Sequence, residues 1–133
     1  MKFRSTLLVL LISFAPAAFA EKTSYPATYA GGSLHLKHNK VRAALENDAV
    51  VFTQGSQRIA VPVKDIKEIA YGTDVRRRSE EHYIGVSWAG GTAQVLLRLS
   101  RAESTEFLAA LERYTGITAV NTDQVPTVVR YQS

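Results

Sequence analysis

Three consecutive arginines are the clearest candidate for binding chemistry in this chain. Arg76, Arg77 and Arg78 are followed, after one serine, by Glu80 and Glu81. Guanidinium groups bind phosphate and carboxylate groups through paired hydrogen bonds, so the run is a candidate anion-binding site. The alternative is a solvated loop between two strands, in which the glutamates neutralise part of the charge. The sequence leaves both interpretations open.

A second basic group lies nearer the N-terminus. Lys37 and Lys40 are found there together with His35, His38 and Arg42. We take Lys37 and Lys40 as further candidate anion ligands, and a solvated strand edge is the alternative. The two histidines are three residues apart, so on an extended strand their side chains point to opposite faces. That arrangement chelates a metal badly, and we predict no metal site.

Known catalytic patterns are not found in this sequence. The chain has no cysteine, which excludes a cysteine nucleophile, a thiolate metal site and a disulfide. Glu80 and Glu81 are adjacent, so on an extended chain their carboxylates diverge. The glycine doublets lack the neighbouring residues of a phosphate-binding loop. We therefore predict a non-enzymatic protein without a cofactor, and a small enzyme with an unrecognised site is the alternative.

The first 20 residues have the pattern of a cleavable export signal. A basic start precedes an apolar run over residues 7–14, and Ala18-Phe19-Ala20 is a small-x-small cleavage pattern. The apolar run is shorter than the roughly 20 residues of a membrane-spanning helix. We expect residues 1–20 to be removed, and a protein in the bacterial periplasm or secreted from the cell. After cleavage we expect no transmembrane span.

The charge balance bears on the class of partner. The full chain has a net charge of +4, and residues 1–20 carry two of its 16 Lys and Arg residues and none of its 12 Asp and Glu residues. Cleavage therefore leaves a net charge of +2. Such a weak bias argues against a nucleic-acid partner, because nucleic acids are bound mainly through many phosphate contacts.

Most of the remaining sequence alternates apolar and polar residues in short segments between turn residues. This pattern predicts an antiparallel meander. We expect a polar lead-in over residues 21–30, and then strands over residues 33–38, 41–45, 49–53, 57–62, 66–72, 82–89 and 92–100. Gly90-Gly91, between the last two strands, is the strongest hairpin signal because both residues can adopt a positive φ.

One segment after the strands predicts an amphipathic helix. Ser100 and Glu103 form a capping-box pattern, and Phe107 and Leu111 recur on one face. Gly116 stands where a left-handed residue commonly ends a helix. The helix must pack on the sheet, a short extra strand could follow over residues 117–120, and residues 121–133 form a tail.

Trp88 is the candidate aromatic contact for a partner. It ends an expected strand next to Ala89-Gly90-Gly91, where its indole ring could be partly exposed. The other large aromatic residues of the domain are expected in the core; they are chiefly Tyr71, Tyr83, Phe107 and Tyr114.

Seven short strands followed by one helix resemble the pleckstrin-homology-like (PH-like) superfold, and more narrowly small bacterial PH-like or GRAM-like domains. The resemblance rests on "IAVPVKDIKEIAYG", "VRRR" and "FLAALERYTGI" and covers residues 29–120. It implies a domain over residues 31–120, built as a partly open barrel of two near-orthogonal antiparallel sheets with the helix capping one end. In familiar members, basic residues near the first hairpin hold lipid head groups, but the hairpin expected here is tighter. Packing and turn residues carry the resemblance, so it implies no activity.

These observations predict an exported, non-enzymatic binding or interaction module. Its expected partner is a protein or peptide, met at a sheet edge or at the barrel mouth opposite the helix, because strand addition needs no sequence motif. The alternative is a binder of anionic lipid or glycolipid that uses the Arg76–Arg78 loop, with Lys37 and Lys40.

Overall fold

The structure is a computed structural model that describes residues 23–76, 79–122 and 125. The export signal predicted over residues 1–20 lies outside the described residues, as do Arg77, Arg78 and most of the tail predicted over residues 121–133. Within the described ranges, no helix is long and apolar enough to cross a membrane.

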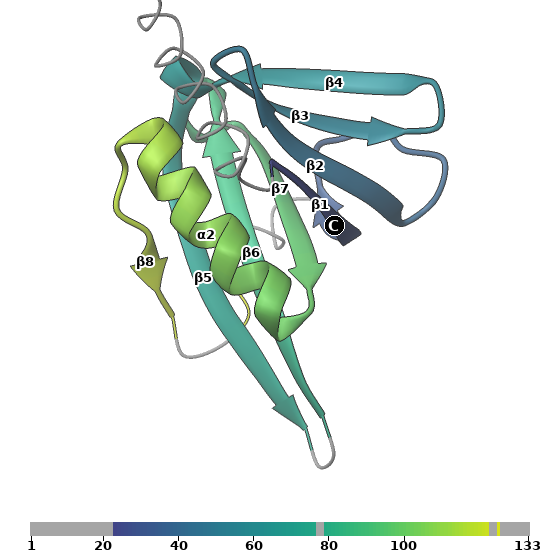
Figure 1. Ribbon diagram of the computed structural model, residues 1–133, viewed down its shortest axis with the longest axis vertical. Helices are drawn as coiled ribbons and strands as arrows, with labels where there is room; N and C mark the ends of the chain where they lie inside the picture. The colour runs from purple at the N-terminus through teal and green to yellow at the C-terminus, as the bar shows by residue number, and fades with distance from the viewer. Residues whose placement is uncertain (1–22, 77–78, 123–124, 126–133) are drawn as a thin grey trace, which may run out of the picture.

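The described residues form eight strands in one open sheet, with the order β4-β3-β2-β1-β7-β6-β5-β8 (Figure 1). Neighbouring strands are antiparallel, except that β8 runs parallel to β5. The predicted class, mainly β with one helix near the C-terminus, is confirmed. The strands are β1 (Ser24–Gly32), β2 (Lys40–Glu46), β3 (Ala49–Gln54), β4 (Gln57–Pro62), β5 (Ile66–Arg76), β6 (Ser79–Trp88), β7 (Ala93–Leu99) and β8 (Val120–Asn121).

The first strand is not where the sequence pattern predicts it. The expected strand over residues 33–38 is a loop, and β1 lies largely in the segment expected as a polar lead-in. Tyr25 is buried, and Ala27 and Tyr29 are partly buried against the same core. Every second residue of this segment therefore faces the core, but the polar neighbours and Pro26 make the alternation hard to recognise in the sequence. The proline is tolerated because this end of β1 pairs with β2 but not with β7.

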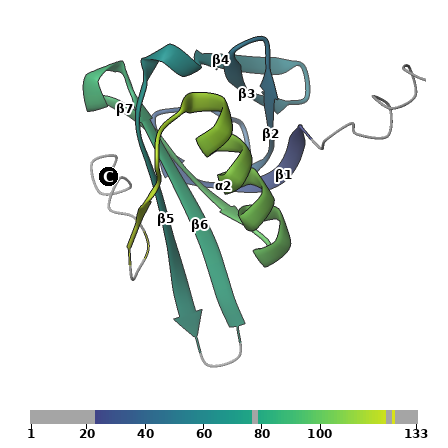
Figure 2. The same ribbon diagram turned by 60° about the vertical axis from the view of Figure 1, so that its left-hand side comes forward.

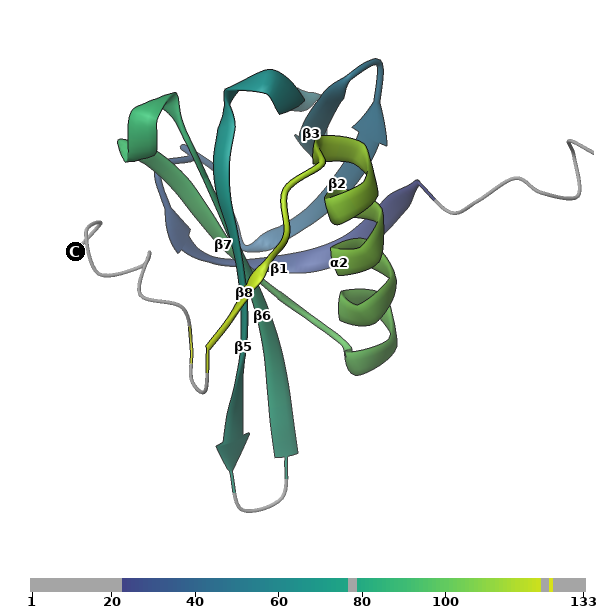
Figure 3. The ribbon, with the colours of Figure 1, turned by 90° about the vertical axis from the view of Figure 1, so that its left-hand side faces the viewer.

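The helix begins and ends where the sequence predicts. In α2 (Arg101–Thr115), Ser100 Oγ accepts a hydrogen bond from Glu103 N at 3.1 Å. Gly116 has φ 77°, and its N–H donates to Glu112 O at 2.9 Å. The helix lies along one face of the β5–β7 part of the sheet, with β1 passing beside it (Figure 3).

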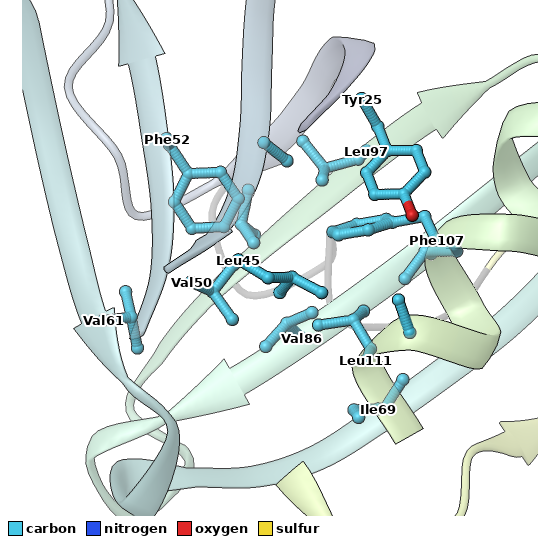
Figure 4. Close-up of a cluster of buried hydrophobic side chains, with 14 of the residues drawn as sticks. Tyr25, Leu45, Val50, Phe52, Val61, Ile69, Val86, Leu97, Phe107 and Leu111 are labelled. Atoms are coloured by element: carbon cyan, nitrogen blue, oxygen red, sulfur yellow. The ribbon is translucent and has the colours of Figure 1, made fainter. Parts of the chain in front are cut away.

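The core fills the space between α2 and the sheet (Figure 4). Phe107 and Leu111 of α2 are fully buried, and the ring of Phe107 packs on that of Tyr25 with centroids 5.0 Å apart. This contact ties the helix to β1. The other core residues labelled in Figure 4 come from six strands, and they are Leu45, Val50, Phe52, Val61, Ile69, Val86 and Leu97.

Short turns lie on either side of the β5–β6 hairpin, where the bounds of the expected strands leave room for them. A single 3-10 turn, η1 (Val63–Asp65), leads into β5, and η2 (Ala89–Gly91) joins β6 to β7. Gly90 and Gly91 have φ values of 69° and 92°, as the predicted hairpin requires. The long β5–β6 hairpin extends beyond the end of the helix (Figure 2).

The two edges of the sheet differ. β8 pairs with β5 at Ala70 and Tyr71, and Thr122 N donates to Tyr71 O at 2.8 Å. The start of the tail therefore covers part of the β5 edge. At the other end of the sheet, β4 pairs only with β3 within the part of the chain that the structure describes. β4 is thus an open edge.

Candidate functional site: a cleft lined by opposite charges

An open cleft of about 700 Å³ lies among β1, the start of β2, the end of β3, the start of β6 and the end of β7. These five segments come from distant parts of the sequence. Its charged and ionisable lining residues are His38, Lys40, Arg42, Glu80, Glu81 and Arg98. The cleft therefore brings basic residues of β2 and β7 together with acidic residues of β6.

Strand pairing positions the basic side of the cleft. Thr28 of β1 pairs with Lys40 of β2 on one side and with Arg98 of β7 on the other. Residues directly opposite one another on neighbouring strands present their side chains on the same face of the sheet. Lys40 and Arg98 therefore flank Thr28, and their Cα atoms are roughly 10 Å apart at the usual strand spacing. Arg42, opposite Pro26, continues the basic surface.

The acidic side of the cleft is formed by Glu80 and Glu81. Their carboxylates diverge, as predicted: Glu80 Oε1 lies 3.8 Å from His82 Nε2, whereas Glu81 Oε1 lies 3.7 Å from Arg98 Nη1. Glu81 Oε1 also accepts a hydrogen bond from the hydroxyl of Tyr83 at 3.0 Å. Burial, and then the hydrogen bond and charge of Glu81, raise the pKa of Tyr83, so this phenol remains a donor. Glu81 thus has ordered neighbours within the cleft.

Gln54 holds the loop that leads into the basic side of the cleft. Its side-chain Oε1 accepts hydrogen bonds from Lys37 N at 2.8 Å and His38 N at 3.2 Å. Its Nε2 donates to the carbonyl oxygens of His38 and Lys40, each at 2.6 Å. The buried carboxamide therefore makes all four of the hydrogen bonds available to it. The tight first hairpin predicted from the sequence is wrong, because a loop over residues 33–39 joins β1 to β2.

Replacing Gln54 by leucine is expected to lower the free energy of unfolding by about 2 kcal/mol, because loop backbone groups lose their partners while side-chain volume is kept. The amide protons of Lys37 and His38 should exchange faster with solvent. Urea unfolding and hydrogen exchange measure the two effects. Ser56→Ala, in the exposed turn nearby, is the control and should change stability by less than about 0.5 kcal/mol. Unchanged exchange at both amides would contradict this role of Gln54.

The structure places two of the predicted basic residues in or near the cleft. Lys40 lines it. Lys37 is exposed in the loop over residues 33–39, and its backbone N–H is bound by Gln54. Both lysines are exposed, Lys40 lines the cleft, and anion binding by either residue stays a prediction.

Arg76 and Trp88, the other predicted site residues that the structure describes, do not line the cleft. Arg76 ends β5, directly opposite Ser79 at the tip of the hairpin, and Arg77 and Arg78 lie outside the described residues. Trp88 is half-buried and packs against the core. It ends β6, eight residues beyond Glu80 and hence roughly 26 Å along the strand. Trp88 is therefore not part of the cleft.

Sequence reasoning did not single out Arg98. This residue is distant from Lys40 in sequence, and the two are brought together because β1 pairs with both β2 and β7. A signal was present for Arg42, since Lys40 and Arg42 are two residues apart and a strand places such residues on one face. No comparable local signal exists for Arg98.

Comparison with known proteins assigns no family to the chain. The sequence matches no model of a known protein family, and the search of curated proteins found no match. Among the described residues, no three His, Asp or Glu side chains gather closely enough to hold a metal ion.

Proposed function

We propose that the protein is a non-enzymatic binding module whose cleft binds a segment of a partner protein or a peptide. The observation that carries this proposal is the opposite charge of the residues lining the cleft: Lys40 and Arg42 on β2, Glu80 and Glu81 on β6. A peptide segment can offer acidic and basic side chains to such a surface. Complementary charge of this kind favours specific recognition between proteins.

A sheet edge is the second place where the same class of partner could bind. β4 is an end strand of the sheet, and a two-residue turn joins it to β3. In such a hairpin the residues flanking the turn exchange hydrogen bonds, so the backbone groups of Arg58 and Ala60 point away from β3. An extended segment could add to this edge.

An anionic lipid or glycolipid surface is the alternative ligand, bound through Arg76–Arg78 with Lys37 and Lys40. The exposure of both lysines favours it. The position of Glu80 and Glu81 in the cleft opposes it, because carboxylates repel phosphate groups. A small enzyme has less support, since His82, the histidine with the most ordered contacts, is only 5 % exposed.

We also propose a PH-like architecture and an exported location. The support for the architecture is the order β4-β3-β2-β1-β7-β6-β5, together with a helix directly after β7. The support for export is the sequence pattern of residues 1–20. Both remain proposals.

Charge reversal on the basic side of the cleft is expected to remove partner binding. The double variant Lys40→Glu, Arg42→Glu should capture about tenfold less partner from envelope extract than the unmodified protein does. A tenfold drop in affinity corresponds to a loss of about 1.4 kcal/mol of binding free energy. Lys64→Glu, Lys67→Glu is the matched control, because both lysines are exposed and lie outside the cleft.

Two further results discriminate between the alternatives. If Ala60→Pro removes partner binding and the charge reversal does not, the binding site is the β4 edge. The proline removes an outward N–H of this strand without breaking a β3–β4 hydrogen bond. Salt-sensitive binding to anionic vesicles that is lost when Arg76, Arg77 and Arg78 become alanine would support the lipid alternative. Full partner retention by the Lys40→Glu, Arg42→Glu variant would refute the cleft proposal.

A further inference from the structure

We infer that the cleft recognises a carboxylate group of its partner segment, bound over Thr28 between Lys40 and Arg98. This inference rests on the proposed function and adds the chemistry of the ligand. The three residues form one row across β2, β1 and β7, because Thr28 pairs with both of the others. The row presents an ammonium group, a hydroxyl group and a guanidinium group on one face of the sheet.

The donors of Lys40 and Thr28 are available to a ligand, and those of Arg98 are partly engaged by Glu81 and Tyr83. Lys40 is exposed, and none of the described residues hydrogen-bonds or ion-pairs with its ammonium group. The Thr28 hydroxyl likewise has no hydrogen-bond partner within the described ranges. Arg98 lies 3.7 Å from Glu81, which is too long for a hydrogen bond. The guanidinium has five N–H donors, so its contacts with Glu81 and Tyr83 leave others free.

The spacing of the two cations suits a small anion. With Cα atoms roughly 10 Å apart across two strand spacings, each side chain has to span about half that distance. Both Lys40 and Arg98 have side chains long enough to meet over Thr28. A carboxylate at that point would accept N–H bonds from the ammonium group and from the guanidinium, once the Arg98 side chain turns from Glu81 and Tyr83 of β6 toward Thr28.

The acidic side of the cleft selects a monoanion over a dianion. Lys40, Arg42 and Arg98 contribute three positive charges to the lining, and Glu80 and Glu81 contribute two negative charges. Among these five residues the surplus is one positive charge. One carboxylate balances it, whereas a phosphate dianion exceeds it and is repelled by the nearby Glu81 more strongly than a singly charged carboxylate is. The ligand class is therefore an acidic side chain or a chain-terminal carboxylate.

The inference is tested by titrating ¹⁵N-labelled protein with three small probes and following backbone amide signals. The probes are N-acetyl-aspartyl amide, its neutral isostere N-acetyl-asparaginyl amide, and inorganic phosphate. The aspartyl probe should give saturable shifts at Thr28, Lys40 and Arg98. The asparaginyl probe should bind at least roughly tenfold more weakly, and phosphate should bind more weakly than the aspartyl probe. N-acetyl-glycine then tests whether a chain-terminal carboxylate binds equally well.

Matched variants assign the effect to the row. Lys40→Met and Arg98→Met keep an aliphatic side chain but remove its charge. Each change should weaken the binding of the aspartyl probe roughly tenfold. Lys67→Met, an exposed lysine outside the cleft, should leave binding unchanged. The dispersed amide spectrum of each variant reports that it is folded. Equal binding of the aspartyl and asparaginyl probes, tighter binding of phosphate, or unchanged binding in Arg98→Met would overturn the inference.

The experiments distinguish a failure of the carboxylate inference from a failure of the proposed partner-binding function. Suppose that a partner segment without any carboxylate binds the protein and that its binding is lost in the Lys40→Glu, Arg42→Glu variant. This result would overturn the carboxylate inference but would still support the proposed binding module. Partner capture that is insensitive to the Lys40→Glu, Arg42→Glu change, together with no probe shifts in the cleft, would overturn both.

Discussion

Replacing Gly32 by alanine is expected to lower the free energy of unfolding by roughly 3–5 kcal/mol, the first of the two largest effects we predict. Gly32 ends β1 at φ 130°, a backbone conformation that side chains disfavour. A Cβ atom there would overlap Gln94 O and lie 2.7 Å from Val95 Cα. Both are backbone atoms of β7, so neither can rotate aside. The β1–β7 pairing on which the cleft depends would therefore be forced apart.

Gly55→Ala separates backbone strain from this overlap. Gly55 also has a positive φ, 61°, but a Cβ there has no atom within 4 Å. We expect the free energy of unfolding of this variant to fall by only about 1–2 kcal/mol, the usual cost of placing a residue with a Cβ atom in the left-handed conformation. Urea unfolding of the two variants gives the comparison. Equal losses would contradict the close approach of β1 and β7 at residue 32.

Phe107→Ala is expected to cost about 3–5 kcal/mol, because a fully buried ring is removed from a packed core. Phe107 is the helix residue that packs on Tyr25 of β1, with ring centroids 5.0 Å apart. The melting temperature should fall by at least about 10 °C, given the usual relation between stability and Tm in a domain of this size. A fall of this size would show that helix docking on β1 contributes a large part of the stability.

Glu106→Ala is the matched control for the helix, because it changes the neighbouring, exposed position. Its unfolding free energy should stay within about 0.5 kcal/mol of the unmodified protein. Thermal unfolding followed by circular dichroism compares the two variants. A Phe107→Ala protein as stable as Glu106→Ala would refute the packing of α2 described above.

The helix was predictable from the sequence because its ends depend on local chemistry. A serine hydroxyl and the backbone N–H three residues on satisfy each other within one turn, so Ser100 marks the start. A left-handed residue ends a helix at low cost only if it is glycine, so Gly116 marks the end. Neither feature needs information from elsewhere in the chain.

β1 was not predictable because a misleading alternation follows it. Leu34 and Leu36 alternate with polar residues as they would in a strand, but they pack against the core from a loop. Tyr29 fixes this loop: its hydroxyl accepts from Leu34 N at 3.2 Å and donates to Leu34 O at 3.1 Å. Such a contact depends on the tertiary fold, so periodicity alone does not distinguish it from a strand.

The cleft was not predictable for a related reason. Arg98 joins Lys40 only because β1 pairs with two strands that are distant in sequence. Gln54 looks like an ordinary turn residue in the sequence, and its role becomes visible only once its carboxamide is buried against the loop. The arginine run was the most prominent sequence feature, and anion binding at Arg76–Arg78 stays a prediction.

Site-specific photocrosslinking tests the central claim most directly. A photoreactive amino acid replaces Thr53, which lines the cleft, or Lys67, which does not, and the protein is irradiated with envelope extract. We predict a discrete protein adduct from position 53, no such adduct from position 67, and loss of the position-53 adduct when Lys40→Glu and Arg42→Glu are added. An adduct from position 67 alone, or one from position 53 that survives the charge reversal, would contradict a partner-binding cleft.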